Sequence, residues 1–339
     1  MDVVETCLQQ PFASLTNLFN KAEQIFKQNF GNKLFLYAPG MVNYETSYCK
    51  SHPLAFPAIS VTEKRCYLNC EHCGGKLLES MFPASSPYQL YSLMKKLIEK
   101  GAKGFLISGG SNKEGYVPLK PFLPIVAKIK REFSVEIVVH CGLPPPPLVD
   151  ALAEAGVDGV LVDIVGSDLT LKQVCHLEQR VEAFRDLLKR LSDHSLPVVP
   201  HIVVGIHYGK ILGEKAALEI ISGFQPAAVV IVALMPLEGT GMMDVMPPSP
   251  QDIGRIMLAA RLLLPNTPIV LGCARPRGAS RVSVDALAVR CGVNGVTYPS
   301  DALFTICKRR GIALIFSEKC CGLIWKDIYK QVGEVGLRL

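Results

Sequence analysis

The sequence predicts an α/β protein in which eight parallel strands alternate with helices and close into a (β/α)8 barrel. Short apolar segments with strand character recur along the chain, at 57–63, 104–109, 135–140, 159–164, 197–204, 227–234, 268–272 and 294–298. Segments with helical spacing lie between and after them, at 88–100, 121–131, 147–155, 171–193, 214–223, 250–263, 284–291 and 300–310. Eight such strand–helix units are the number that closes a barrel.

The chain before the first strand has a different pattern. Apolar residues from Leu15 to Phe30 recur at helical spacing, and Gly31 supplies a stop. We expect residues 1–55 to form an N-terminal helical leader and loop, and residues 56–339 to form the barrel with a C-terminal tail.

Composition fits a well-buried globular protein, because 49% of the 339 residues are hydrophobic and 19% are charged. The net charge of +6 suits an acidic protein partner and is too small to indicate nucleic-acid binding. The longest apolar run, Ala227 to Pro236, is too short to span a bilayer. The opening residues, Met1 to Glu5, do not resemble a secretory signal. Twelve cysteines in such a chain suggest metal binding or catalysis, and we expect a cytoplasmic protein.

Three closely spaced cysteines form the most informative motif of the sequence. Cys66, Cys70 and Cys73 form a Cys-x3-Cys-x2-Cys run directly after the first predicted strand, where barrel enzymes carry their active sites. Three thiolates at this spacing can hold a four-iron cluster and leave one iron open to a small chelating molecule. A structural zinc site, with Cys49 or His72 as a fourth ligand, and a set of unliganded thiols are the alternatives.

This spacing, with the ring of His72 one residue before the last cysteine, resembles the radical S-adenosylmethionine (SAM) enzymes. The resemblance implies that Cys66, Cys70 and Cys73 bind a [4Fe-4S] cluster whose open iron binds the amine and carboxylate of SAM. It also implies that SAM is cleaved to a 5′-deoxyadenosyl radical, which removes hydrogen from an unreactive carbon. The expected fold is then a TIM-type radical SAM barrel.

Further positions are expected to contact SAM. The second strand ends at Ser108-Gly109-Gly110, where glycines let the backbone approach a ligand, and in the family the matching turn binds the methionine amine. Asp163 is a carboxylate in an apolar strand and needs a partner, either the SAM ribose or a neighbouring loop. The fifth strand ends near Gly205, in a region similar to the one that the family places against adenine.

A second group of thiols lies late in the chain. The seventh strand leads into Cys273 and Arg275, and period-2 geometry puts both on one face. If that face is the lumen, a thiolate and a guanidinium project together into the site, where the arginine could instead bind a carboxylate. The adjacent pair Cys320-Cys321 is expected in a tail that folds across the barrel mouth. We predict that Cys273, Cys320 and Cys321 bind a second [4Fe-4S] cluster; a structural or free thiol pair is the alternative.

Residues 56–315 resemble the biotin synthase branch, in the passages Pro248 to Pro265, Cys273 to Arg275 and Gly292 to Gly295. Nearly the whole chain resembles one subunit of the two-protein lipoyl synthase of archaea and some bacteria, through Cys66 to Glu79, His201 to Gly209, Gly272 to Pro276 and Cys320-Cys321. This implies sulfur insertion into an octanoyl chain on a lipoyl-domain protein or peptide. It also implies a second homologous subunit and an electron donor such as ferredoxin or flavodoxin. Two other classes stay open: a radical SAM methylase or cofactor-maturation enzyme without sulfur transfer, and a non-catalytic iron–sulfur partner subunit.

Overall fold

The architecture is built on one curved sheet. The computed structural model describes residues 2–40, 42–329 and 336–337. Within them the strands follow the order β12-β11-β1-β10-β9-β8-β7-β6-β5-β4-β2-β3, and every neighbouring pair is parallel except β11 with β12. The strands are β1 Lys33–Tyr37, β2 Ala58–Ser60, β3 Phe82–Pro83, β4 Gly104–Ser108, β5 Glu136–His140, β6 Gly159–Asp163, β7 Val198–Val204, β8 Val229–Ala233, β9 Ile269–Leu271, β10 Gly295–Thr297, β11 Ala313–Ser317 and β12 Gly336–Leu337.

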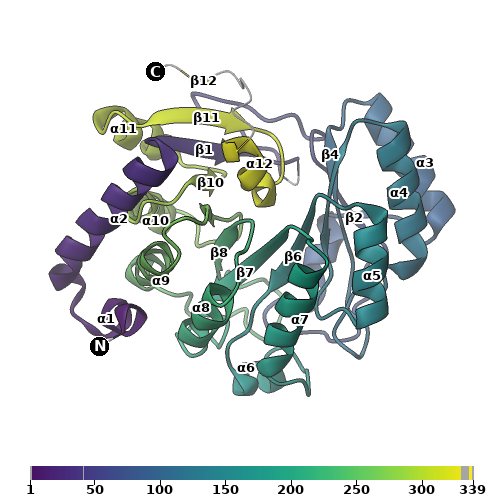
Figure 1. The fold of residues 1–339 in the computed structure, drawn as a ribbon, viewed down its shortest axis with the longest axis horizontal. Coiled ribbons are helices and arrows are strands. Elements are labelled where there is room, and N and C mark those ends of the chain that lie inside the picture. The colour runs from purple at the N-terminus through teal and green to yellow at the C-terminus, as the bar shows by residue number, and fades with distance from the viewer. Residues whose placement is uncertain (1, 41, 330–335, 338–339) are drawn as a thin grey trace.

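Helices cover the convex side of the sheet (Figure 1). Local signals fix several of their ends: Ser249 and Asp252 form a reciprocal capping box at the start of α9, and Gly31 ends α2 in a left-handed conformation. The α-helices are α1 Val3–Gln9, α2 Thr16–Phe30, α3 Pro87–Glu99, α4 Leu123–Glu132, α5 Pro146–Ala155, α6 Asp168–Gln173, α7 Glu182–Asp193, α8 Glu214–Ser222, α9 Pro250–Leu263, α10 Ala279–Arg290, α11 Asp301–Arg309 and α12 Ile324–Tyr329. Short 3-10 helices are η1 Phe12–Leu15, η2 Lys76–Ser80, η3 Lys120–Phe122 and η4 Cys321–Leu323. No helix in the described ranges is long and apolar enough to cross a membrane.

Strands β4 to β9 each contribute to two separate apolar cores. Along β5, Ile137 and Val139 belong to the outer core beneath the helices, whereas Val138 belongs to a smaller core on the concave side. Leu161 of β6 and Val199 of β7 share that inner core. The concave side is therefore the barrel interior. Residues two positions away from these three side chains on the same strands face it as well.

The predicted barrel-type α/β fold is confirmed, and the eight predicted strands are β2 and β4 to β10. The structure differs from the prediction in closure. β1 and β11, which the sequence did not assign to the sheet, pair beside β10, and the described sheet is open rather than closed. β1 lies within the stretch expected to be a helical leader.

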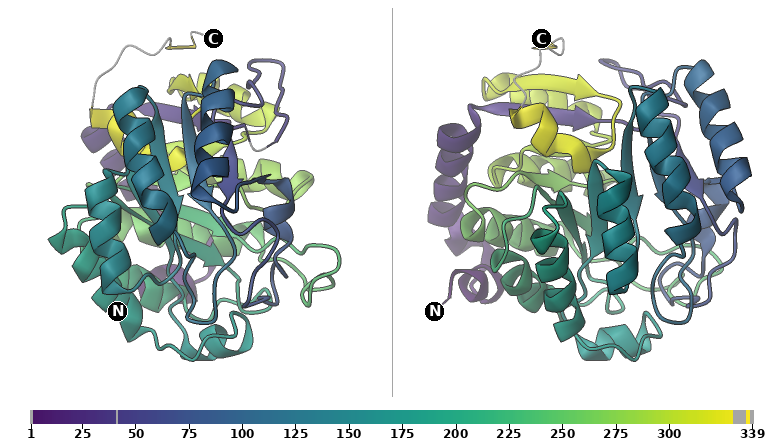
Figure 2. Two further views of the ribbon diagram at one scale, coloured as in Figure 1. Left: turned by 90° about the vertical axis from the view of Figure 1, so that its right-hand side faces the viewer. Right: turned by 45° about the vertical axis from the view of Figure 1, so that its right-hand side comes forward.

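Two connections also differ from the prediction. The single helix expected over 171–193 is two helices, α6 and α7, separated by a loop. Residues 318–329 of the tail do not lie over the mouth: η4 contacts β6, β8 and β10 from inside the curve, and α12 lies between β11 and β4 (Figures 1 and 2). The apolar side chains of Leu323 and Ile324, both fully buried in the inner core, explain why the tail enters the interior.

Candidate functional site

The three motif cysteines lie on an irregular loop, residues 61–75, which follows β2 and is called the cluster loop below. Its tight path depends on backbone hydrogen bonds to the Cys70 carbonyl from the amides of Cys73 (3.1 Å) and Gly74 (2.8 Å). Asn69 takes a positive φ of 46°, a conformation that asparagine tolerates. All three thiols are half-buried, so they are accessible to a ligand on one side.

The glycine turn after β4 packs directly against this loop. A Cβ added to Gly110 would lie 2.0 Å from the Arg65 carbonyl oxygen and 2.5 Å from the Cα of Cys66. The Gly110 amide donates to Thr62 Oγ1 at 2.6 Å, and Ser108 Oγ donates to the His140 carbonyl at 2.9 Å. Gly110 is thus required for the cluster loop to approach the sheet, whatever the turn binds.

The loop between α6 and α7 holds the cluster loop from the other side. His176 has its Nδ1 2.7 Å from the Leu68 carbonyl and its Nε2 3.1 Å from a Glu71 carboxylate oxygen. The Glu71 amide donates to the Val174 carbonyl at 2.9 Å. Sequence reasoning missed these residues because the helical pattern of 171–193 hid the break. His176 has a φ of 56°, which no helix accommodates.

A fourth thiol, Cys175, lies in the same break. Cys70 Sγ donates to the Cys175 carbonyl at 3.5 Å. Hydrogen bonding with Cys175 raises the pKa of the Cys70 thiol, and hydrogen bonding with Cys70 raises the pKa of Cys73 to about 12. The ring of His72 also hydrogen-bonds Cys73. Iron must therefore displace protons from these thiols when it binds.

Three polar side chains, from β5, β6 and β7, face the interior. His140 Nε2 lies 3.4 Å from Asp163 Oδ2, and the rings of His140 and His201 meet edge to face with centroids 5.8 Å apart. Each of these residues lies two positions after a residue of the inner core on the same strand and therefore points to the same side; the core residues are Val138, Leu161 and Val199. The three polar side chains thus form a layer above an apolar floor. We call this set the polar trio.

Charge pairing in the polar trio sets its protonation. Burial opposes the Asp163 charge, but nearby His140 and then His201 outweigh it and hold the pKa of Asp163 well below its usual range. Burial likewise disfavours charged His140, yet the Asp163 carboxylate raises the pKa of His140. Burial lowers the pKa of His201 to about 4, with the His140 charge adding to the effect. His140 and Asp163 thus form an ion pair, and His201 is neutral.

The late cysteines lie in the interior as well. Cys321 is buried in the inner core, and Cys320 packs against that core. Cys273 follows β9, which ends at Leu271; desolvation by the surrounding protein atoms raises the pKa of its thiol to about 11, and the charge of Cys321 adds to the shift. Cys273 remains accessible to solvent.

Arg275 does not accompany Cys273. Its guanidinium pairs with Asp285 at 2.9 Å and donates to the carbonyls of Gly272 (2.8 Å), Thr297 (2.6 Å) and Tyr298 (3.1 Å). The expectation that Arg275 shares a ligand-facing side with Cys273 is wrong, because β9 ends at Leu271 and strand alternation does not continue beyond it. Arg275 is a buried structural residue.

Gly205 adopts a φ of 73°, and a Cβ there would meet Pro248 at 2.9 Å. Its amide donates at 2.7 Å to the buried carboxylate of Glu214, which also accepts from the amides of Leu212 (2.9 Å) and Gly213 (3.1 Å). Glu214, which the sequence did not reveal as important, therefore fixes the loop where adenine was expected.

The structure gives no support to a zinc site. Among the described residues, no group of three His, Cys, Asp or Glu is arranged to hold a single metal ion. Cys49, the suggested fourth ligand, lies near Tyr44 and Tyr298, with its Sγ 3.5 Å from Thr46 Oγ1. In an iron–sulfur cluster each cysteine binds its own iron, so the three motif thiols need not converge on one point.

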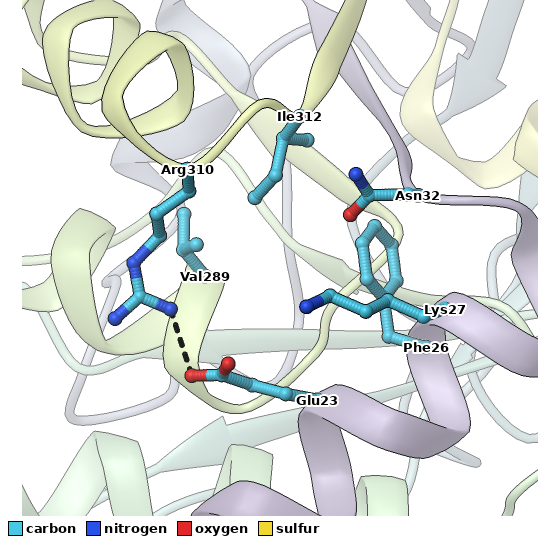
Figure 3. Close-up of a pocket in the computed structure, with 7 residues that line it drawn as sticks. All are labelled: Glu23, Phe26, Lys27, Asn32, Val289, Arg310 and Ile312. Atoms are coloured by element: carbon cyan, nitrogen blue, oxygen red, sulfur yellow. Dashed lines mark hydrogen bonds and ion pairs between the residues drawn. The ribbon is translucent and has the colours of Figure 1, made fainter.

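An outer pocket lies between α2, α10 and the segment before β11, where Arg310 pairs with Glu23 at 2.7 Å (Figure 3). None of the predicted site residues lines it. Its lining residues are Glu23, Phe26, Lys27, Asn32, Val289, Arg310 and Ile312.

Comparison with known proteins decides the class of the site. Residues 61–214, which span the cluster loop, the glycine turn and the polar trio, match the radical SAM superfamily. Residues 61–214 therefore carry a radical SAM domain. Its cofactors are a [4Fe-4S] cluster and SAM, and the residues fit them: three half-buried thiols can bind three irons, and Gly110 keeps the backbone beside them free of a side chain.

The chain is also similar in sequence to curated biotin synthases and in fold to two solved structures. Biotin synthase of Prochlorococcus marinus (strain MIT 9301) is 24% identical over 255 residues, covering 73% of this chain and 74% of the relative. Biotin synthase of Synechococcus sp. (strain RCC307) is 26% identical over 190 residues, covering 55% and 56%. Methylornithine synthase matches with a TM-score of 0.63 at 16% identity, over 96% of this chain and 95% of that one. HydG, a maturase of the [FeFe]-hydrogenase, matches with a TM-score of 0.68 at 14% identity, over 96% and 73%.

Proposed function

We infer that this radical SAM enzyme inserts sulfur into an octanoyl chain carried on a protein lysine, as one subunit of a lipoyl synthase. The observation that carries this proposal is the second thiol set, Cys273, Cys320 and Cys321, inside the same barrel as the cluster loop. The similarity to biotin synthases over 73% of the chain supports sulfur chemistry in particular.

The roles of the residues follow from their positions. Cys66, Cys70 and Cys73 would hold the [4Fe-4S] cluster, while the Ser108–Gly110 turn, Asp163 and Gly205 would bind SAM. When bound, these cofactors supply the one-electron chemistry that removes a hydrogen atom from an unreactive carbon. Meanwhile His176 and Glu71 hold the cluster loop in place, and the inner core keeps bulk water from the floor of the site.

The second thiol set would hold an auxiliary [4Fe-4S] cluster that supplies the sulfur. Thiolates bind iron, so cluster binding must overcome the raised pKa values of Cys273 and Cys321. Arg275 has no direct part in this, because Asp285 already pairs with it.

The proposed function requires three partners. An octanoylated lipoyl-domain protein or peptide is the substrate, a second homologous subunit adds the other sulfur, and ferredoxin or flavodoxin supplies electrons. We propose a cytoplasmic setting, with no nucleic acid or membrane involved.

The test is mass spectrometry of an octanoyl-lysyl peptide after anaerobic turnover, with the enzyme alone and with its proposed partner subunit. A gain of one sulfur is expected. Cys70→Ala should abolish SAM cleavage, whereas Cys321→Ala should leave cleavage intact and remove the thiolated product. If Cys321→Ala removes neither, the auxiliary site is wrong.

Metal analysis separates the proposal from the alternatives. Two four-iron clusters give about eight irons per chain, and one gives about four. About four irons, SAM cleavage and no sulfur gain would indicate a methylase or maturation enzyme. If reduced, reconstituted protein does not cleave SAM at all, a non-catalytic partner subunit is the better description.

A further inference from the structure

The polar trio offers hydrogen-bonding groups that no described residue of the protein uses. His201 Nδ1 lies 3.0 Å from the Val199 carbonyl, which can only accept, so this nitrogen carries the proton. Because His201 is neutral, its Nε2 is an acceptor, and no described residue hydrogen-bonds to it.

His140 provides the complementary group. The ion pair with Asp163 keeps it protonated, so both ring nitrogens are donors. Nε2 faces Asp163, whereas Nδ1 has no hydrogen-bond partner in the described part of the chain. One donor and one acceptor without a described protein partner thus face the interior from β5 and β7, the two strands that flank β6.

The surroundings indicate the kind of ligand. Below the polar trio the inner core is apolar, and Val203, Leu106 and Ala274 are its partly exposed members. Side chains of His140 and Asp163 are 28% and 44% exposed although they face the interior, so this layer is open to a ligand from the mouth. A ligand that fits has an apolar chain joined to a group with one acceptor and one donor.

We propose that His140 and His201 bind the amide that joins the acyl chain to its carrier lysine. His140 Nδ1 donates to the amide oxygen, and the amide N–H donates to His201 Nε2. This inference rests on the function proposed above and names the feature by which the substrate is selected.

The same geometry explains which acyl groups are rejected. A thioester or ester lacks the N–H and leaves the buried acceptor of His201 unpaired, which costs affinity. A free fatty acid has no N–H either, so it also leaves the His201 acceptor unpaired. The enzyme should therefore distinguish acyl-lysine from acyl-thioester carriers.

The test measures binding by reconstituted holoenzyme under anaerobic conditions, with fluorescence anisotropy of labelled peptides. One peptide carries octanoyl-lysine, and a matched peptide carries the octanoyl group on an ester oxygen. Wild type should bind the amide about tenfold more tightly, the size expected for one net hydrogen bond. In His201→Phe the amide should lose this advantage, so the two peptides bind equally.

Two further variants guard against a purely structural effect. His201→Gln retains an acceptor and should restore part of the amide preference. His194→Phe alters a surface histidine that pairs with Asp150, and should keep the full preference. If the amide-to-ester ratio is the same in wild type and His201→Phe, or if wild type has no preference, the inference is overturned.

The outcome also separates this inference from the proposed function. Wild-type enzyme that adds sulfur to the amide peptide while binding amide and ester equally would refute only the role of the two histidines. If neither peptide binds and no sulfur is added, both proposals fail.

Discussion

Replacing Gly110 with alanine should displace the cluster loop while leaving the barrel folded. The added Cβ would lie 2.0 Å from the Arg65 carbonyl oxygen and 2.5 Å from the Cα of Cys66. Contacts under 3.0 Å are essentially never seen for real Cβ atoms. The cluster loop must therefore move away from the glycine turn by at least 1.0 Å. Both contacts are backbone atoms, which a rotamer change cannot relieve.

Such overpacking costs typically about 1–3 kcal/mol, and a backbone clash belongs at the upper end. A penalty of about 3 kcal/mol on the cluster-binding conformation corresponds to an affinity roughly 150-fold weaker. The assay is iron and sulfide content after anaerobic reconstitution at limiting iron, with thermal unfolding as a check on the fold.

Gly109→Ala is the matched neighbour. Its Cβ would meet only side-chain atoms of Thr62 and Val117, at 3.0 to 3.2 Å, and these can adjust. Gly109→Ala should therefore retain much more iron than Gly110→Ala. Equal iron content in Gly110→Ala and wild type would show that the close approach of this turn does not control cluster binding.

Three further outcomes are expected. His176→Ala removes both contacts of that ring with the cluster loop, so iron loss to a chelator should be about tenfold faster. An unchanged rate would show that His176 does not hold the cluster loop in place. Asp285→Asn leaves the buried Arg275 charge unpaired, so urea unfolding should show a loss of about 3–5 kcal/mol, and a loss under about 1 kcal/mol would contradict the pairing. The pKa of His201 is about 4 in the fold against 6.5 ordinarily, so below pH 6.5 the unfolded chain binds a proton that the fold excludes. Stability of the wild type should therefore fall as pH drops from 6.5 to 4, by on the order of 1–3 kcal/mol more than in His201→Phe; parallel urea-unfolding profiles for the two proteins would count against this.

Periodicity predicted the fold where an element's own residues determine it. The eight predicted strands and most helices are present because their apolar faces point at a core that runs along the whole sheet. β1 and β11 were missed because both lie outside the regular strand–helix alternation, and their pairing with each other joins residues more than 270 positions apart. No local pattern reports such a pairing.

Sequence likewise revealed candidate site residues that lie together on one loop, and missed those whose role depends on contacts between distant segments. Cysteine spacing could select Cys66, Cys70 and Cys73 as candidate ligands because all three lie on one loop. His176 was missed because it lies in the break between α6 and α7, and the contacts of that break with the cluster loop are visible only in the folded structure. Arg275 was misassigned because strand alternation was extended past Leu271, where the strand ends. His201 passed unnoticed because its importance arises from strand pairing with Asp163.

The tail holds Cys320 and Cys321 in a fixed position rather than as a loose extension. Before the cysteine pair, Lys319 pairs with Glu136 at 3.4 Å, and after it Lys326 pairs with Glu136 at 3.2 Å and with Asp158. Glu136 begins β5, and Asp158 immediately precedes β6, so these contacts tie both sides of the pair to the start of the strands.

Burial and charge together make this docking specific. Burial disfavours the Asp158 charge, but hydrogen bonds from Lys130 and Lys326 outweigh it and lower the pKa of Asp158, which keeps the anchor charged at neutral pH. η4 and the start of α12 meanwhile fill the inner core with Leu323 and Ile324. Removing the chain after Ser317 would therefore uncover the apolar floor of the barrel as well as delete two thiols. For that reason, point substitution of the cysteines, rather than truncation, is the perturbation that isolates their chemistry.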